Sequence, residues 1–273
     1  MRIGVIGLGM VGEAVTYGLR KLGHTVIPYD TNKDKNTGPF EDLLDTTILF
    51  ICVPTPTVKG QCDVSIVDRV VSHLARANYR GLAVIKSTVP PGTTKHIRSG
   101  RAVRLAFCPE FLRERARFTD FFEDHELCIA GVFPLYGKDD AELIREAHGN
   151  LPKNFVVMSP TEAELAKYFV NCFNAQRVVF ANAFYDVCKQ VGADYNTVKE
   201  AVTKRKGIEG DYLTCNEYTR EFGGSCLPKD TEAFWAFADS LGLATRVFEM
   251  ICRENKRVAD RKLMLDDIKR SVA

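Results

Sequence analysis

The chain has 273 residues, of which 45% are hydrophobic and 26% are charged, and its formal net charge is +2. This length can bury one large core or two smaller ones, and usual domain sizes favour two domains. The balanced charge, without a basic block, does not indicate a nucleic-acid partner, and no apolar run is long enough to span a membrane.

The nine cysteines form no C-x-x-C pair, and no histidine stands at a metal-ligand spacing from them. Disulfides and structural zinc are therefore not expected, and no metal site is predicted. Reduced thiols fit an enzyme of the cytoplasm.

Short β-branched runs alternate with helical stretches from Met1 to about Ser159. The expected strands are residues 2–6, 25–29, 47–53, 83–86, 104–107, 128–132 and 155–158. Such alternation is typical of a parallel sheet wrapped by helices, so residues 1–159 are predicted to form a doubly wound α/β domain.

The sequence G-L-G-M-V-G at residues 7–12 follows the first strand directly and opens a helical pattern that ends near Gly23. Gly7, Gly9 and Gly12 allow a tight turn, approach of the backbone to a pyrophosphate, and close packing of helix on strand. Met10 and Val11 lie at the helix N-terminus that would hold the anion.

Asp30 ends the second strand and would accept hydrogen bonds from ribose hydroxyls. Together with the glycine motif it predicts a Rossmann-type domain that binds NAD. Lys33 and Lys35 leave NADP as an alternative.

The strand pattern stops at Pro160, and residues 160–273 are predicted to form an all-helical domain. Residues 161–191 lack Gly and Pro and open with Thr161 and Glu164 at the spacing of a capping box, which predicts one helix of roughly 45 Å. Further helical patterns cover residues 230–239 and 244–269. The long helix carries apolar side chains that either fill a core or also form a homodimer interface: Phe169, Phe173, Val178, Phe180, Phe184 and Val187.

Cys226 lies behind Gly223 and Gly224 and just ahead of a helix start, with Pro228 at the expected first helical position. A thiol at the positive end of a helix dipole, with Lys229 close by, is expected to be a nucleophile. The alternative is a small buried hydrophobic residue, as most free cysteines are.

Four further segments lie between these two motifs: F-I-C-V-P-T-P at 50–56, K-S-T-V-P-P-G-T at 86–93, C-P-E-F-L-R-E at 108–114, and E-L-A-K-Y at 164–168 with Asn171. In this order, and followed by F-G-G-S-C-L-P-K-D at 222–230, they resemble the UDP-glucose/GDP-mannose dehydrogenase family over nearly the whole chain. Several motifs in register are far more specific than any one of them.

The resemblance implies an enzyme that oxidises the C6 alcohol of a nucleotide sugar to a carboxylate in two hydride transfers to NAD. UDP-glucose is the favoured substrate. GDP-mannose is one alternative, and a catalytically weak nucleotide-binding subunit of a larger assembly is another. Family members commonly continue into a third domain, and this chain is expected to lack it, because it ends within what resembles the helix leading there.

The resemblance also implies the catalytic roles. Cys226 would carry the substrate as a thiohemiacetal and then a thioester. Lys167 and Asn171, four residues apart on one helix face, would stabilise the oxyanion. Asp230 and Thr88 would hold a water, and Glu110 would be the general base of thioester hydrolysis. The predicted catalytic residues are Cys226, Lys167, Asn171, Asp230, Glu110 and Thr88.

The same motifs supply the predicted binding residues. Besides the glycine motif and Asp30, those for the cofactor are Lys35, Val53, Pro54, Thr55, Ser87, Thr88, Glu114 and Lys229. Those for the substrate are Glu110, Phe111, Leu112, Arg113, Glu114, Lys167, Asn171, Tyr212, Leu213, Phe222 and Gly223.

Overall fold

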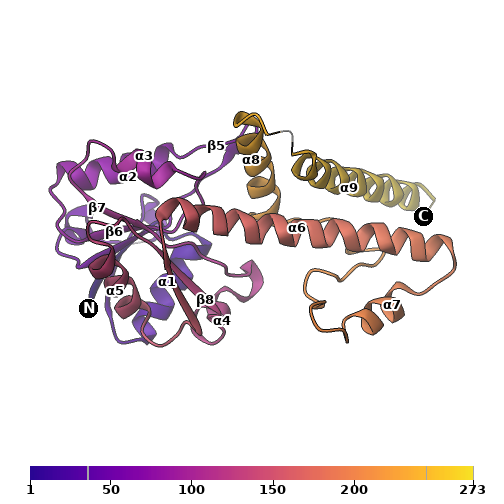
Figure 1. The fold of residues 1–273 in the computed structure, drawn as a ribbon, viewed down its shortest axis with the longest axis horizontal. Coiled ribbons are helices and arrows are strands. Elements are labelled where there is room, and N and C mark those ends of the chain that lie inside the picture. The colour runs from indigo at the N-terminus through magenta and orange to yellow at the C-terminus, as the bar shows by residue number, and fades with distance from the viewer. Residues whose placement is uncertain (36, 244, 273) are drawn as a thin grey trace. The chain divides into compact units, whose positions relative to one another are not determined.

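The computed structural model describes residues 1–35, 37–243 and 245–272, and it describes side chains as far as residue 260. The chain divides into two compact units (Figure 1). Unit 1 consists of residues 1–58 and 62–167, and unit 2 of residues 59–61 and 168–273. The predicted helix over 244–269 begins at a residue outside the described ones.

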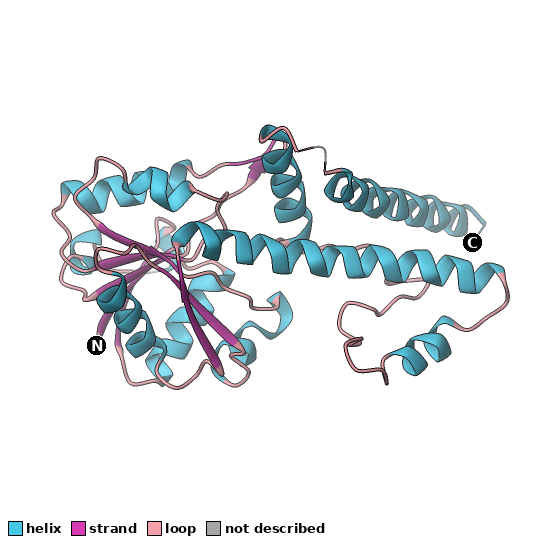
Figure 2. Cartoon of the chain, viewed as in Figure 1, coloured by secondary structure: helices cyan, strands magenta, loops and turns pink. Residues whose placement is uncertain are grey.

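Unit 1 is built on a seven-stranded sheet with the strand order β2-β1-β3-β6-β7-β8-β9. Figure 2 shows its strands in magenta. The strands are β1 Arg2–Ile6, β2 Thr25–Tyr29, β3 Ile48–Ile51, β6 Leu82–Ile85, β7 Arg104–Phe107, β8 Leu127–Gly131 and β9 Asn154–Met158. Each lies within or beside a predicted strand, so the α/β prediction is confirmed.

One pairing departs from the parallel pattern. Strands β7 and β8 are antiparallel, through Phe107 and Gly131. The chain between them forms η3 Glu114–Ala116 and α4 Arg117–Phe122. The chain re-enters the sheet at the same end at which β7 left it, and neighbouring strands connected in this way run antiparallel.

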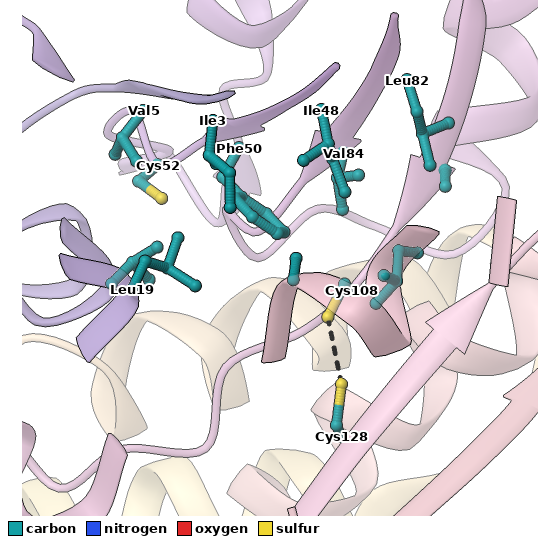
Figure 3. Close-up of a cluster of buried hydrophobic side chains, with 14 of the residues drawn as sticks. Ile3, Val5, Leu19, Ile48, Phe50, Cys52, Leu82, Val84, Cys108 and Cys128 are labelled. Carbon is teal, nitrogen blue, oxygen red and sulfur yellow. Dashed lines mark hydrogen bonds between the residues drawn. The ribbon is translucent and has the colours of Figure 1, made fainter. Parts of the chain in front are cut away.

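Helices cover both faces of the sheet, because its strands are apolar on both sides. One core joins Ile3, Phe50 and Val84 to helices α1 Met10–Lys21 and α5 Gly137–His148 (Figure 3). The other joins the alternate strand residues, such as Leu49 and Ile85, to α2 Ser65–Arg76 and α3 Thr93–Arg98. This is the doubly wound arrangement.

Short elements that the sequence does not predict also occur between residues 30 and 65. Strands β4 Thr57–Val58 and β5 Gln61–Cys62 form a small second sheet. Lys59 and Gly60 join them with φ values of 51° and 78°, as a two-residue type I′ turn requires. Two 3₁₀ turns, η1 Lys33–Lys35 and η2 Phe40–Leu43, lie between β2 and β3.

The described parts of residues 168–272 contain helices and loops but no strand, so the prediction of an all-helical region is confirmed. Helix α6 Pro160–Gln190 has 31 residues and begins in unit 1. It is followed by α7 Tyr195–Val202, which the sequence does not predict, then α8 Leu227–Ser240 and α9 Arg246–Val272. The rings of Phe234 on α8 and Phe248 on α9 meet edge to face at 4.9 Å.

The capping box predicted at Thr161 and Glu164 is wrong. The box is formed two residues earlier, where Ser159 N donates to Glu162 Oε2 at 2.8 Å and Glu162 N donates to Ser159 Oγ at 3.3 Å. Pro160 is then the first helical residue, a position that proline favours. Both pairs have the capping-box spacing, and only the tertiary structure separates them.

Glu164 instead caps the N-terminus of another helix, α3. Its side chain is buried, and its carboxylate accepts from Gly92 N at 2.5 Å, Thr94 N at 2.8 Å and Thr94 Oγ1 at 2.6 Å. These amides open α3, whose first N–H groups lack partners within the helix. Among the described residues, no helix is both long and apolar enough to cross a bilayer.

Candidate active site

The glycine loop after β1 is shaped by contacts that only glycine allows. Gly7 has a φ of +87°, and a Cβ there would lie 2.7 Å from the carbonyl oxygen of Cys52. A Cβ on Gly12 would lie 1.8 Å from the carbonyl oxygen of Gly7. Gly9 caps α1, and a Cβ there would meet nothing within 4 Å, so the space above the first turn of α1 is open. Open amides at a helix N-terminus suit a pyrophosphate.

Asp30 is fixed beside this loop. Its Oδ2 accepts from Leu8 N at 2.6 Å, and its Oδ1 accepts from Asn32 N at 2.8 Å. A carboxylate has lone pairs beyond these two bonds, which can accept from ribose hydroxyls. Lys35 Nζ pairs with Glu13 Oε1 at 2.6 Å, at an exposed position. The loop, the helix end and the carboxylate together fit NAD.

The other predicted cofactor residues of unit 1 follow neighbouring parallel strands. Val53 and Thr55 are buried and Pro54 is exposed, just after β3. Ser87 Oγ, just after β6, donates to the carbonyl oxygen of Val53 at 2.7 Å. The half-buried Thr88 follows it. Because β1, β3 and β6 are adjacent, their carboxyl ends meet at one edge, where open α/β sheets bind ligands.

Glu114 and Lys229 are placed elsewhere on the chain. Glu114 begins η3 and is exposed. Lys229 lies in unit 2, where it pairs with Asp230.

Glu110 faces a buried lysine that the sequence analysis did not identify. Lys86 Nζ lies 3.2 Å from Glu110 Oε2, with the side chains 1% and 6% exposed. The same ammonium lies 3.4 Å from Cys108 Sγ. Burial alone would lower the pKa of Lys86, but the charges of Cys108 and Glu110 outweigh it and raise that pKa. The missed signal was a lysine at the end of an apolar strand, since lysine is almost never buried without a partner.

The loop after Glu110 is held by its own contacts. Arg113 donates from its backbone N to Asp120 Oδ2 at 2.8 Å and from Nη2 to Oδ1 at 2.6 Å. Although burial acts to raise the pKa of Asp120, the bonds from Arg113 lower it overall. Phe111 and Leu112 are half-buried. The buried Lys167 has its Nζ 5.3 Å from the centroid of the Phe111 ring, so the structure brings these two predicted substrate residues together.

Cys226 is the N-cap residue of α8, as predicted for a helix start, although Pro228 occupies the second helical position and not the first. The thiol is half-buried, and its Sγ lies 3.5 Å from Ser225 Oγ. It is therefore not the fully buried hydrophobic residue of the alternative reading.

Asp230 and Asn171 lie together in unit 2. Asp230 is 1% exposed, and its Oδ2 accepts from Asn171 Nδ2 at 2.6 Å. Its Oδ1 forms an ion pair with Lys229 Nζ. Its backbone N donates to the carbonyl oxygen of Cys226 at 2.9 Å, so the first turn of α8 carries both the thiol and the carboxylate. Asn171 lies one turn after Lys167 on α6.

The structure separates the remaining predicted substrate residues. Tyr212 has a φ of 61°, an uncommon conformation for a residue with a side chain. Leu213 packs in the cluster that holds Tyr195, whose hydroxyl donates to the Leu213 carbonyl at 2.8 Å. Phe222 is buried in a different cluster, and Asn255 binds its backbone N and O at 2.8 and 3.0 Å. The adjacent Gly223 is exposed.

Two family models match the chain. Residues 35–145 match the NAD-binding domain of the UDP-glucose/GDP-mannose dehydrogenase family, and residues 161–257 match its central domain.

Proteins and structures similar to the chain agree with these models. A UDP-glucose 6-dehydrogenase of Haloferax volcanii is 28% identical over 97% of this chain and 72% of its own length. One of Rickettsia bellii is 31% identical over 84% of this chain, but over only 53% of its own length. The solved structure of a UDP-glucose dehydrogenase from Pyrobaculum islandicum is 32% identical, with a TM-score of 0.83 over 94% of this chain and 68% of that one.

Proposed function

Because this chain belongs to the UDP-glucose/GDP-mannose dehydrogenase family, we propose that it oxidises UDP-glucose to UDP-glucuronate with NAD. The observation that carries the proposal is the half-buried thiol of Cys226 at the start of α8, beside the buried pair of Asp230 and Asn171. In this proposal residues 1–159 are the NAD-binding domain and residues 160–273 the helical catalytic domain.

The proposed reaction has two oxidations and one hydrolysis. When bound, NAD supplies a hydride acceptor for each oxidation. After the first, Cys226 Sγ adds to the C6 aldehyde, and the resulting thiohemiacetal carries a hydrogen on C6 that can leave as hydride. Loss of this hydride gives a thioester, and water then breaks the C–S bond, which releases the carboxylate and restores the thiol. The positive end of α8 favours negative charge on the attacking sulfur.

The neighbouring side chains have distinct roles in this proposal. Asp230 accepts from the Asn171 amide and thereby orients it, so that Asn171 and Lys167 can stabilise the oxygen at C6 as it becomes negative. Thr88 and Asp230 position the water. Glu110 removes a proton from that water during hydrolysis, and Lys86 fixes the Glu110 carboxyl group.

The stoichiometry of the reaction tests the proposal. The purified chain is supplied with NAD and UDP-glucose, and NADH and carboxylate are measured per sugar consumed. Two NADH per sugar are expected, and Cys226→Ser is expected to stop the second oxidation. The matched control is Cys252→Ser, which removes a half-buried thiol on α9.

Three outcomes would contradict parts of the proposal. Unchanged carboxylate from Cys226→Ser would remove the thiol from the mechanism. Turnover of GDP-mannose in place of UDP-glucose would correct the substrate. No turnover with either sugar, but retained NAD binding, would favour a nucleotide-binding subunit of a larger assembly.

A homodimer through α6 is also part of the proposal. Phe169, Phe173, Phe180, Phe184 and Val187 recur at spacings of three, four or seven residues, and their exposed fractions are 72, 51, 58, 46 and 59%. An apolar stripe of this kind on a helix needs a partner surface. Val178 instead packs within unit 2.

Light scattering tests the dimer. The wild-type chain is expected to have the mass of a dimer, and the double substitution of Phe173 and Phe180 by glutamate is expected to give a monomer. Leu135→Glu, at an apolar side chain of unit 1 that is 73% exposed, is the control. A monomeric wild type would contradict the proposal.

We further propose that the enzyme works in the cytoplasm, because Cys226 must stay reduced and all nine cysteines are free thiols. Fractionation of source cells, with the chain detected by antibody, tests this. Recovery outside the cytoplasmic fraction would contradict it.

A further inference from the structure

Unit 1 contains a second cluster of reactive side chains, which the proposed reaction does not use. One ligand atom each of Cys108, Cys128 and His148 lies within 4.8 Å of the other two. The three residues are 0, 1 and 0% exposed. Cys108 follows β7, Cys128 lies on β8, and His148 is the last residue of α5, so three elements meet at this point.

His148 has a nitrogen without a partner. Its Nδ1 lies 2.8 Å from the carbonyl oxygen of Ile144. A carbonyl can only accept, so Nδ1 carries the hydrogen and Nε2 has the lone pair. Among the described residues, Nε2 is buried and has no hydrogen-bond partner. A buried acceptor without a partner destabilises the folded state, so a group that uses it is expected.

The two thiols have the separation that a shared metal ion requires. Cys108 Sγ and Cys128 Sγ lie 3.8 Å apart (Figure 3). An ion at about 2.3 Å from each of two tetrahedral sulfur ligands holds them at about 3.8 Å.

The charges around the cluster balance. Two thiolates and a neutral imidazole neutralise a divalent cation. With its hydrogen on Nδ1 and the lone pair of Nε2 available to the metal, the imidazole is neutral. The ammonium of Lys86 near Cys108 is itself paired with Glu110. A bound divalent ion would therefore leave no net charge in this core.

We propose that Cys108, Cys128 and His148 form a structural site for a thiophilic cation such as Zn²⁺, with a water as the fourth ligand. Binding releases the two thiol protons and forms two metal–sulfur bonds and one metal–nitrogen bond. The site ties the end of β7, two residues before Glu110, to β8 and α5. The proposal differs from the expectation of no metal site, because ligands twenty residues apart match no short zinc motif.

Metal binding to the reduced, chelator-treated chain tests the site. With Zn²⁺, equilibrium dialysis and elemental analysis are expected to find one bound ion per chain. With Co²⁺, sulfur-to-cobalt charge-transfer absorption and the visible bands of a tetrahedral ion are expected. Zn²⁺ is also expected to raise the melting temperature of the chain, since a ligand that binds only the folded state stabilises it.

Variants separate this site from adventitious binding to other thiols. Cys128→Ser and His148→Gln are each expected to lower Zn²⁺ affinity at least tenfold and to abolish the zinc-dependent rise in melting temperature. Cys172→Ser, which removes a buried thiol of unit 2, is the matched control and is expected to bind like wild type.

Two results would overturn the proposal: no Zn²⁺ retained by the wild-type chain, or equal affinity in wild type and Cys128→Ser. If His148→Gln does not fold, Cys128→Ser and the wild-type titration still decide the question. The site does not depend on the proposed reaction, and none of these measurements uses activity.

Discussion

Removing the buried ammonium of Lys86 is expected to destabilise unit 1 strongly. Lys86→Met keeps most of the side-chain volume but leaves Glu110, which is 6% exposed, without the ammonium that lay 3.2 Å from its Oε2. Breaking a buried ion pair by removing one partner costs about 3–5 kcal/mol. In a domain of about 150–250 residues each kcal/mol lowers the melting temperature by about 2–4 °C, so a fall of roughly 6–20 °C is expected.

The second partner supplies the decisive comparison. In Lys86→Met with Glu110→Gln no unpaired charge remains, and the double variant is expected to melt well above Lys86→Met alone. Thermal unfolding followed by far-UV circular dichroism measures both, with Lys95→Met on the exposed side of α3 as control. If Lys86→Met melts within about 2 °C of wild type, or if the double variant is no more stable than it, the pair does not hold Glu110 as argued.

Four further predictions address other parts of the molecule. Gly12→Ala should lower both stability and NAD affinity, because its Cβ would lie 1.8 Å from the Gly7 carbonyl oxygen, whereas Gly9→Ala should fold normally and lose only NAD affinity. Calorimetric titration measures the NAD affinity of each variant, and melting curves measure its stability. Asn171→Ala should reduce the turnover number by about 10²–10³-fold with NAD affinity unchanged, as measured from NADH absorbance, since one oxyanion donor is lost. Glu164→Ala should lower the free energy of unfolding by about 1–3 kcal/mol, because it leaves the amides of Gly92 and Thr94 without an acceptor, and Glu162→Ala should lower it by less. Similar losses of unfolding free energy for the two variants in urea titrations would contradict the assignment of the two caps. Burial lowers the pKa of His125 below 6.5, so the unfolded chain binds the proton more readily than the folded chain, and stability should fall as pH drops below about 6.5. The slope of unfolding free energy against pH, from pH 7.5 to 5.5, should be shallower in His125→Asn and unchanged in the exposed His96→Asn.

The seven strands and the long helix could be predicted because their apolar patterns are long enough to have a period. The hairpin of β4 and β5 could not, since strands of two residues show no alternation. Its turn places Lys59 at a φ of 51°, where glycine would be the expected signal. The start of α6 was predicted two residues late, because two capping-box spacings overlap and only the burial of Glu164 against α3 decides between them.

Some contacts of the candidate site could likewise be predicted from the sequence, and others could not. Residues that stand next to one another in a motif, such as Cys226 and Asp230 on the first turn of α8, could be placed together from the sequence. Lys86 could not be assigned to Glu110, because their contact depends on β6 and β7 being neighbours in the sheet. Strand order is a property of the whole fold, and no spacing in the sequence encodes it.

The cysteine cluster and the proposed base are physically linked, which affects how each is tested. Lys86 Nζ contacts both Cys108 Sγ and Glu110 Oε2, and these two residues are separated only by Pro109. A substitution at Cys108 therefore disturbs the ammonium that holds Glu110, and a loss of activity there would not distinguish metal binding from thioester hydrolysis. Cys128 lies on β8, and this strand positions its Sγ next to Cys108 Sγ. Cys128→Ser is thus the variant that tests the metal site with the Lys86 to Glu110 contact intact, and Lys86→Met tests that contact with both thiols present.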